Sequence, residues 1–297
     1  MKLAQRLKRV LRRFWPRKPR IHLYTICWNE AQILPFFFRH YESWVDRIYV
    51  YDNGSTDESR AILARHPKVK LRDFPWSYPD SFVQSQRAFF DRCWRNSRGR
   101  ADWVVVTDLD EHLHHPDLMG YLATCRRKGI TCIPALGYEM VSDRFPGPHE
   151  CLARTITSGA PSRKMNKLRL FDPDALIRTN FTTGCHRAAP KGRVVYPERD
   201  ELLLLHYKNF GVDYRLTRNK LLLAELRPID IEKGRGHAYV GSREEVEAIF
   251  EKLRATALDV TDPGYRPWDE PEGRPRWWRE PWPSAPLSPP RESPSAA

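Results

Sequence analysis

A group of three carboxylates and one imidazole follows an apolar run near the middle of the chain. The run is Trp103–Val106, and Asp108, Asp110, Glu111 and His112 come shortly after it. Consecutive β-branched residues are typical of a buried strand. Where such a strand opens into a loop, carboxylates at alternate positions, here Asp108 and Asp110, can both approach one divalent cation. A strand that ends in an acidic turn has the same pattern, so this stretch alone leaves both interpretations open.

Two earlier stretches that read as strands also end in polar residues. Residues 21–27 are followed by the sequence WNE, and residues 46–51 are followed by DNGSTD at positions 52–57. Asn-Gly within the second cluster marks a tight turn. Because parallel strands present their carboxyl ends at the same edge of a sheet, we expect both clusters to lie beside Asp108 and Asp110.

The alternation of strands and helices predicts an α/β fold. Strands are predicted at 21–27, 46–51, 69–74 and 103–106, and helices are predicted between them. This order implies parallel strands joined by right-handed crossovers. We therefore expect a Rossmann-like, mostly parallel sheet that is flanked by helices, with further helices towards the C-terminus.

Polar residues at the predicted helix starts are candidate caps. Asn29 is the predicted N-cap of a helix that runs to residue 44, with Pro35 either tolerated near its start or forcing a restart. Ser55 or Thr56 is the predicted cap of the next helix. Residues 242–245, SREE, form a capping-box signature for a last helix.

Composition limits the class of protein. The 297 residues are 41% hydrophobic, which suffices for a globular core, and their formal net charge is +13. This charge indicates an anionic partner, whether nucleic acid, a lipid headgroup surface or a phosphorylated substrate. Six scattered cysteines without a CxxC pair favour reduced thiols and argue against a zinc site. With no apolar run of membrane-span length and no apolar signal core, we expect a soluble or peripheral protein.

The chain divides into three predicted regions. Residues 1–20 alternate basic and apolar residues at helical spacing, a pattern that suits either contact with an anionic membrane leaflet or a solvated helix packed on the domain. Residues 21–261 form the predicted main domain. Residues 262–297 are rich in proline and tryptophan, so we expect an extended or disordered tail that docks, if at all, through its tryptophans.

Several motifs occur in a fixed order along the main domain. They are Trp28-Asn29-Glu30, Leu34-Pro35, Tyr51 through Asp57, Gln86, and Trp103 through Glu111. Their order and residue patterns resemble the nucleotide-sugar-binding half of family-2-like glycosyltransferases with the GT-A fold. The resemblance is to a bacterial branch with the motifs N-E, D-N-x-S-x-D and D-x-D-E. The resemblance covers roughly residues 21–210, and such an ordered set is far more specific than a lone D-x-D.

The resemblance implies roles for residues at the three strand ends. Asp108 and Asp110 would hold Mn²⁺ or Mg²⁺ against the diphosphate of a sugar donor, because a hard cation takes oxygen ligands and neutralises charge on the leaving group. Asp52 would bind the nucleobase or ribose, and Thr25 and Glu30 would line the same pocket. For Asp57, in contrast, turn chemistry is the favoured role.

Residues later in the chain complete the candidate site. His206, at the end of an apolar run, is the preferred histidine of the metal or diphosphate shell, with a core histidine as its alternative, whereas His112 and His186 stay unassigned. Residues 138–165 are read as acceptor-side loops. Further candidates are Lys220, Lys167 or Arg169 for the donor phosphates, residues 234–237 as a lid, and Glu111, Glu139 or Asp143 as the general base.

The function that these expectations define is metal-dependent glycosyl transfer of the hexosyltransferase type. The donor would be a nucleotide sugar, with a UDP-sugar preferred, and the acceptor a hydroxyl group on a glycan or lipid-linked substrate. By resemblance, we expect inversion and a role in bacterial surface polysaccharide or lipopolysaccharide synthesis. We expect a cytoplasmic location, peripheral at the inner face of the membrane if residues 1–20 bind it.

Two other classes of protein are considered. One is a basic protein that binds nucleic acid or an anionic membrane without catalysis. It is disfavoured because no nucleic-acid-binding motif occurs and much of the positive charge lies in the terminal segments, so we expect no nucleic-acid partner. The other is a nucleotidyltransferase, for which a Gly-rich, lysine-bearing phosphate loop near the first strand is missing.

Overall fold

The parallel half of the central sheet carries all three of the predicted polar strand ends. In the computed structural model, which describes residues 18–268 and 276–280, its four strands lie in the order β3-β2-β1-β4 and are all parallel. Every residue of β1 and β4 is buried, as expected for strands covered on both faces. The bounds are β1 Ile21–Cys27, β2 Arg47–Asp52, β3 Val69–Asp73 and β4 Trp103–Val106.

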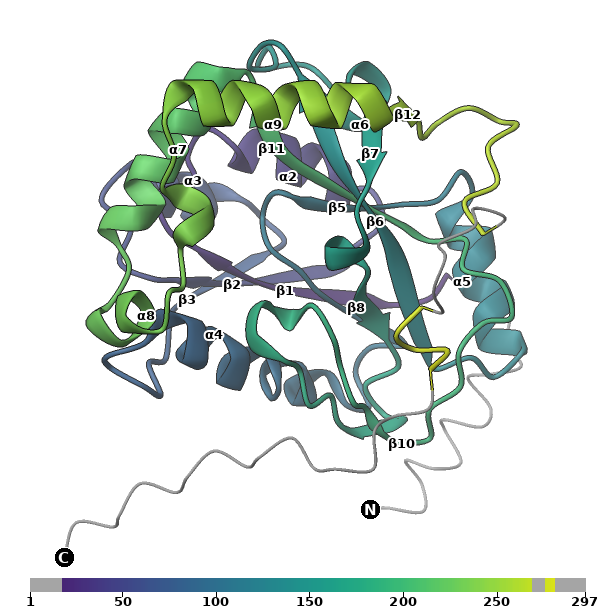
Figure 1. Cartoon of the computed structure of the whole chain (residues 1–297). Helices are drawn as coiled ribbons and strands as arrows, with labels where there is room; N and C mark the ends of the chain where they lie inside the picture. The colour runs from purple at the N-terminus through teal and green to yellow at the C-terminus, as the bar shows by residue number, and fades with distance from the viewer. Residues whose placement is uncertain (1–17, 269–275, 281–297) are drawn as a thin grey trace, which may run out of the picture.

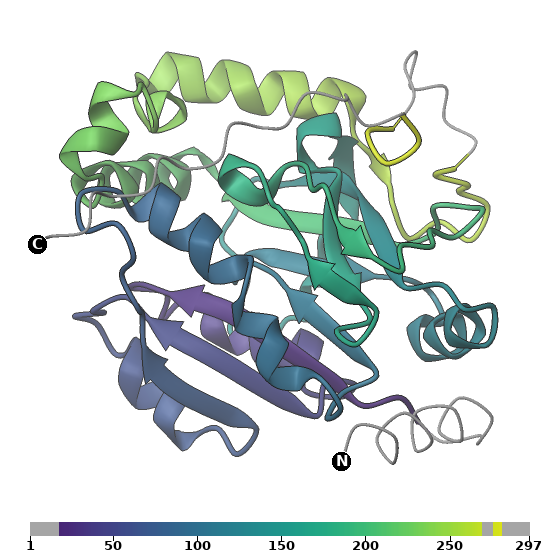
Figure 2. The ribbon, with the colours of Figure 1, turned by 90° about the horizontal axis from the view of Figure 1, so that it is seen from below.

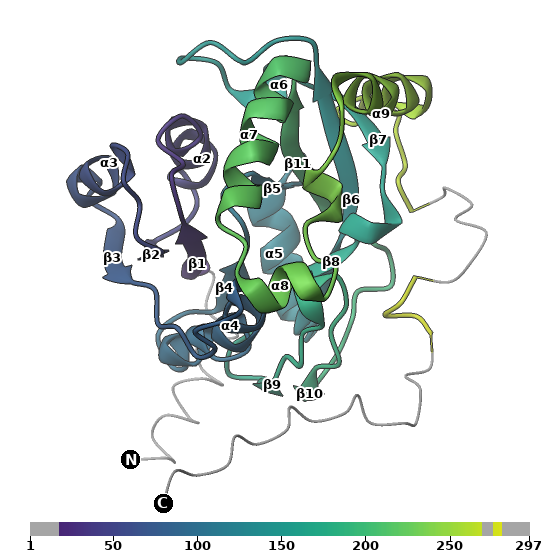
Figure 3. The ribbon, with the colours of Figure 1, turned by 60° about the vertical axis from the view of Figure 1, so that its left-hand side comes forward.

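Helices cover both faces of this half. Helices α2 and α3 lie on one face and α4 on the other (Figures 1 and 3), and α4 stands in front of the strands when they are seen from below (Figure 2). The bounds are α2 Leu34–Tyr41, α3 Ser59–Arg65 and α4 Phe82–Phe90, with a 3-10 turn η1 at Cys93–Ser97. The predicted α/β fold, a mostly parallel central sheet flanked by helices, is confirmed.

The second half of the sheet is mixed and extends from β4. Strand β8 is antiparallel to β4, β6 is antiparallel to β8, and β7 and β12 continue to the edge. Strand β11 is parallel to β6 and antiparallel to β5, so it brings a late segment of the chain beside the β4–β5 turn. The bounds are β5 Glu111–His114, β6 Cys132–Ser142, β7 Ser158–Pro161, β8 Lys167–Phe171, β11 Leu203–Phe210 and β12 Leu258–Asp259.

The remaining elements surround this half. Helices α7 and α9 pack on the β6–β11 region (Figure 1), and α9 begins with the predicted capping box formed by Ser242 and Glu245. Two short strands, β9 and β10, pair separately. The bounds are α5 Leu118–Arg127, α6 Leu152–Thr155, α7 Val212–Ala224, α8 Pro228–Glu232, α9 Arg243–Thr256, β9 Leu176–Arg178, β10 Lys191–Gly192, η2 Arg163–Met165, η3 Thr183–Cys185 and η4 His237–Tyr239.

Both predicted caps of the first two helices are wrong. Asn29 has a positive φ of 51°, and α2 begins only at Leu34, where Pro35 occupies the first turn. Neither Ser55 nor Thr56 caps α3, which begins at Ser59. Instead Asn29 Oδ1 accepts a hydrogen bond from the Thr56 N–H at 2.7 Å, so the two polar clusters bind each other.

Two further predictions from local pattern are corrected. Residues 138–142 do not belong to a loop, because strand β6 continues to Ser142. The leucine-rich sequence of residues 213–227 predicts a helix with its leucines on the buried side, but in α7 Leu221 and Leu223 are 43% and 37% exposed, whereas Arg215 and Asn219 are buried. The fully buried side chains of α7 are therefore polar, while Val212 and Leu216 pack on a small apolar cluster that includes Val246 and Phe250 of α9.

Part of the proline- and tryptophan-rich tail docks on the main domain. Trp277 and Trp278 are buried, and their indole N–H groups donate to Asn166 O at 2.8 Å and Asp200 Oδ1 at 3.1 Å. Residues 269–275 and 281–297 lie outside the described residues, as does nearly all of the basic segment 1–20. The six cysteines, all in the described part, are free, as predicted. Among the described residues, no helix is both long and apolar enough to span a bilayer.

We expect acid to destabilise the fold below pH 6.5, because His22 and His40 are held neutral. Burial lowers the pKa of each imidazole to about 4. Between this value and the unfolded pKa of about 6.5, the unfolded chain binds protons that the folded chain does not, so the free energy of unfolding falls as the pH falls. Each imidazole contributes at most about 3.5 kcal/mol across this window, from about 1.4 kcal/mol per pKa unit.

Urea unfolding at pH 7, 6 and 5 measures this effect. The variant His22→Asn keeps an amide that can bond to Ser97 and should flatten the dependence on pH, whereas His237→Gln, at an exposed position, should leave it unchanged. Equal slopes for both variants and the wild type would show that His22 does not contribute.

Candidate active site

Asp108 and Asp110 lie in the turn between β4 and β5, at the carboxyl end of a central strand. Backbone hydrogen bonds fix this turn: the Glu111 N–H donates to Asp108 O at 3.2 Å, and the Tyr207 N–H of β11 donates to Asp110 O at 2.7 Å. The side chains of both aspartates remain about one-third exposed, at 32% and 31%. The turn thus presents two fixed, accessible carboxylates, as the sequence predicts.

Asp108 has one polar partner on each carboxylate oxygen. Its Oδ2 lies 3.0 Å from Arg169 Nη2, and its Oδ1 accepts a hydrogen bond from Gln86 Nε2 at 3.3 Å. Burial, together with the neighbouring Glu111 carboxylate, raises the pKa of Asp108 to about 6 in spite of Arg169. This aspartate sits where a further cation would stabilise its charged form.

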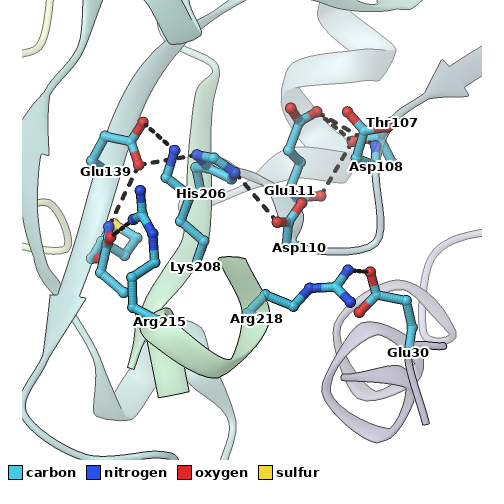
Figure 4. Close-up of polar contacts among 12 residues, drawn as sticks. Glu30, Thr107, Asp108, Asp110, Glu111, Glu139, His206, Lys208, Arg215 and Arg218 are labelled. Atoms are coloured by element: carbon cyan, nitrogen blue, oxygen red, sulfur yellow. Dashed lines mark hydrogen bonds and ion pairs between the residues drawn. The ribbon is translucent and has the colours of Figure 1, made fainter. Parts of the chain in front are cut away.

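Asp110 belongs to a chain of charged groups that is centred on His206 (Figure 4). His206 Nε2 lies 3.4 Å from Asp110 Oδ2, and His206 Nδ1 donates to Glu139 Oε2 at 3.0 Å. Burial opposes the proton on His206, but Glu139 and Asp110 outweigh it and raise the pKa of His206 to about 9. His206 thus lies beside the D-x-D turn, as expected for the metal or diphosphate shell, and it is also buried with both ring nitrogens facing carboxylates, as expected for its alternative as a satisfied core histidine.

Glu111 is the centre of a second, fully buried charge cluster. Its Oε1 lies 2.6 Å from Lys167 Nζ, and its Oε2 lies 2.6 Å from Arg169 Nη2. Burial opposes ionisation, but these two cations hold the pKa of Glu111 well below its usual range. A buried carboxylate with both oxygens paired is a poor general base. Lys167 and Arg169, which the sequence suggested might face a phosphate, are turned to the carboxylates instead.

The other two predicted general bases, Glu139 and Asp143, are also poorly suited to that role. Glu139 lies on β6 rather than in a loop, and its pKa is well below the usual range because His206 and Lys208 outweigh the effect of burial. Asp143 is 80% exposed and forms an ion pair with Arg254 of α9. No contact joins Asp143 to the aspartates of the turn among the described residues.

Arg218 is the basic residue of α7 that faces the site. Its guanidinium forms an ion pair with Glu30, the acid at the first strand end (Figure 4). Burial raises the pKa of Glu30 to about 8 despite Arg218, with Asp110 among the carboxylates that add to the effect. Lys220 is exposed; two residues further along a helix, it points to the opposite side. Lys220, the predicted phosphate contact, therefore does not face the site, whereas Arg218 does.

The strand end at Asp52 holds polar atoms that lack partners. Asp52 Oδ2 accepts from the Gly54 and Ser55 N–H groups, both at 3.1 Å, and lies 2.6 Å from Arg60 Nη1. Asp52 Oδ1 and both side-chain amide atoms of Asn53 are buried without a hydrogen-bond partner in the described part of the chain. Since unpaired buried polar groups are costly, these atoms suit a ligand that supplies the missing bonds.

The remaining strand-end residues have structural roles. Thr25 is fully buried inside β1, and its hydroxyl donates to Ile26 O at 3.4 Å, so it is not open to a ligand. Asp57 accepts from the Ala31 N–H at 3.0 Å and the Ser59 N–H at 2.9 Å, which is the predicted turn chemistry. His112 is buried and stacks on His40 with ring centroids 4.4 Å apart, a packing contact in the core.

The donor atoms at the turn are of the type that a divalent cation takes, but they do not form a closed cage. Two accessible carboxylates and an imidazole whose Nε2 faces one of them suit Mn²⁺. Glu139 accepts a hydrogen bond from His206 Nδ1 and so fixes the ring, as carboxylates commonly do for metal-binding histidines. Across residues 18–268 and 276–280, however, no three His, Cys, Asp or Glu side chains are gathered closely enough to hold a metal.

One family model matches part of the chain. The model of glycosyltransferase family 92 matches residues 24–127, about one third of the 297 residues, and the matched stretch includes the Asp52 strand end and the turn with Asp108 and Asp110. This match supports a glycosyltransferase. No curated protein matches the sequence.

Among the solved structures that resemble the chain are three of low similarity. Glucosyl-3-phosphoglycerate synthase from Mycobacterium tuberculosis, solved with Mn²⁺, UDP and glucosyl-3-phosphoglycerate, is 20% identical over 40% of this chain and 44% of its own, with a TM-score of 0.28. TarS residues 1–349 from S. aureus are 9% identical over 78% and 69%, with a TM-score of 0.35. GalNAc-T7, solved with UDP, GalNAc and Mn²⁺, is 10% identical over 80% and 55%, with a TM-score of 0.39. The chain thus spans less than half of the first of these proteins.

Proposed function

We propose that this protein is a glycosyltransferase that moves a sugar from a nucleotide-sugar donor, preferentially a UDP-sugar, to a hydroxyl acceptor. The observation that carries the proposal is the convergence of Asp52, Glu30 and the Asp108–Asp110 turn at one edge of the sheet. The partial match to a glycosyltransferase family supports it, since that match contains all of these residues.

The residues can be assigned to parts of the donor. Asp52 Oδ1 and the Asn53 amide have unused hydrogen-bonding capacity that suits the base or ribose. Asp108 and Asp110 are the proposed ligands of Mn²⁺ or Mg²⁺, with His206 beside them as a third candidate, and a bound cation would neutralise charge on the departing nucleoside diphosphate. Arg218 offers a further positive charge beside Glu30 at the same edge.

The finer features of the reaction are proposals from the sequence. We propose an inverting hexosyl transfer, a glycan or lipid-linked acceptor, and a role in surface polysaccharide synthesis at the inner face of the membrane. Inversion needs a base at the acceptor hydroxyl. Glu111 and Glu139 are held by cations, which disfavours protonation of either carboxylate, and Asp143 pairs with Arg254 away from the turn, so none of these three carboxylates suits this role.

Calorimetric titration with UDP, GDP, CDP and dTDP, each with Mn²⁺ and again with EDTA, tests the proposal. We expect one nucleotide, UDP, to bind, and only with metal. Arg218→Gln should weaken binding by about tenfold, equivalent to about 1.4 kcal/mol, whereas Lys220→Gln on the opposite side of α7 should not change it. A folded wild-type protein that binds none of the four nucleotides would refute the proposed function and favour a non-catalytic anion-binding protein.

A further inference from the structure

A cavity of about 270 Å³ lies beside the start of β8, outside the group of residues assigned to the donor. Small-molecule sites commonly measure about 300 to 1,000 Å³, so this cavity has room for one sugar-sized group. Three segments far apart in the sequence build it: η2, the residues after η3, and the docked tail. The lining side chains include Arg163, Lys164, His186, Arg187, Arg276 and Trp277.

The lining of the cavity is positively charged. Among the described residues that line it are four Lys or Arg residues and no carboxylate. Two of the cations are balanced from outside: Arg187 lies 2.9 Å from Glu280, and Arg276 lies 2.7 Å from Asp200. Lys164 is exposed and has no ion-pair partner among the described residues. The cavity therefore retains positive charge that an anion could neutralise.

His186 lies at the wall of the cavity. Its Nδ1 donates to Lys164 O at 2.8 Å, which fixes the ring at the cavity wall. Burial, together with the nearby charges of Lys167, Lys164 and Arg169, lowers the pKa of His186 to about 4. A buried imidazole of this kind stays neutral and can accept or donate a hydrogen bond without adding charge.

Strand register places the cavity next to the candidate active site. Strand β8 is antiparallel to β4, with Val105 opposite Leu170. If this register is extended beyond the paired residues, Asp108 lies opposite Lys167. The next residue, Asn166, lines the cavity. The cavity and the D-x-D turn therefore share one edge of the sheet.

The order of the strands also shows on which side of the proposed donor residues the cavity lies. Asp52 follows β2, on one side of β4, and the cavity lies at β8, on the other side. A nucleotide that extends from Asp52 to Asp108 would direct its sugar towards the cavity. An acceptor must approach the sugar from the side away from the departing diphosphate in an inverting displacement.

We propose that this cavity binds an anionic group of the acceptor, a phosphate ester or a carboxylate carried on a sugar. The role as acceptor site rests on the proposed function, whereas anion binding itself does not. Trp277, fixed by its hydrogen bond to Asn166 O, adds an aromatic surface to the cationic lining. Aromatic surfaces with polar groups nearby suit ligands that are apolar on one side and polar on the other, as sugars are.

Direct binding of small anions tests the site without donor or metal. Calorimetry with inorganic phosphate, glucuronate and neutral glucose should show binding of one or both anions but not of glucose, and the tighter anion identifies the group. Lys164→Gln/Arg187→Gln should weaken this binding at least tenfold. The matched control Lys252→Gln/Arg65→Gln, which removes the same charge at exposed positions, should not change it. Absence of anion binding, equal loss in both double variants, or displacement of the anion by UDP would overturn the proposal.

Release of UDP from UDP-sugars with Mn²⁺ tests the acceptor role. With glucose, glucuronate and glucose 6-phosphate as acceptors, an anionic acceptor should stimulate the wild type most, and Lys164→Gln/Arg187→Gln should lose that stimulation but keep donor hydrolysis. Stimulation by glucose alone would overturn the acceptor role even if anions bind. Metal-dependent UDP binding in the same variants reports separately on the proposed function.

Discussion

Asp110→Asn should reduce the metal-dependent release of UDP from a UDP-sugar by about a hundred- to a thousandfold, as loss of one preorganised charge-stabilising group does in other enzymes. The change replaces one carboxylate oxygen by an amide nitrogen and removes the negative charge that faces His206. Asp110 is about one-third exposed, and the backbone bond that fixes its turn uses its carbonyl oxygen, so the turn should persist. The loss should therefore appear in activity and in metal-dependent UDP binding rather than in folding.

The matched control is Asp213→Asn. This aspartate is 85% exposed and pairs with Arg243 at the surface, so the same chemical change should leave UDP release unchanged. Circular dichroism and the thermal midpoint of Asp110→Asn should match those of the wild type. Full activity in a folded Asp110→Asn protein would show that the turn is structural and that the carboxylates do not hold a metal.

The strands were predictable because their signals are local. Runs such as Trp103–Val106 combine β-branched residues with burial on both faces, and the strand at 21–27 has the predicted bounds. The proximity of His206 to Asp110 has a different origin. It requires β11 to pair with β5, a short strand at Glu111–His114 whose charged sequence gives no strand pattern. The prediction of His206 came from resemblance, and long-range pairing supplies its physical cause.

The roles of the basic residues were not predictable from local pattern. On α7, both Arg218 and Lys220 suit a phosphate, and the face that is buried decides between them. The leucines of this helix favour the wrong face, because the actual buried face carries Arg215 and Asn219 and contacts other polar groups. The carboxylates of Asp108 and Glu111 require cations as partners once they are buried. The alternation of basic and apolar residues in Lys167–Phe171 could have indicated Lys167 and Arg169 as those cations.

Arg169→Met should lower the free energy of unfolding by about 3 to 5 kcal/mol, the usual cost of removing one partner of a buried ion pair. Arg169 is fully buried and contacts both Asp108 and Glu111. With Lys167 these groups form a quartet of two cations and two anions, so the loss of Arg169 leaves one uncompensated negative charge. Methionine fills similar space without strain, which confines the effect to charge. Urea unfolding at pH 7 measures it.

The double variant Glu111→Gln/Arg169→Met separates charge imbalance from lost packing. Removing Glu111 together with Arg169 restores a neutral cluster of Asp108 and Lys167, so the double variant should be more stable than the sum of the two single losses predicts. A coupling of about 2 kcal/mol or more would fit a mutually dependent buried pair. Additive losses would instead mean that Arg169 stabilises the core by packing alone and that Asp108 does not depend on its charge.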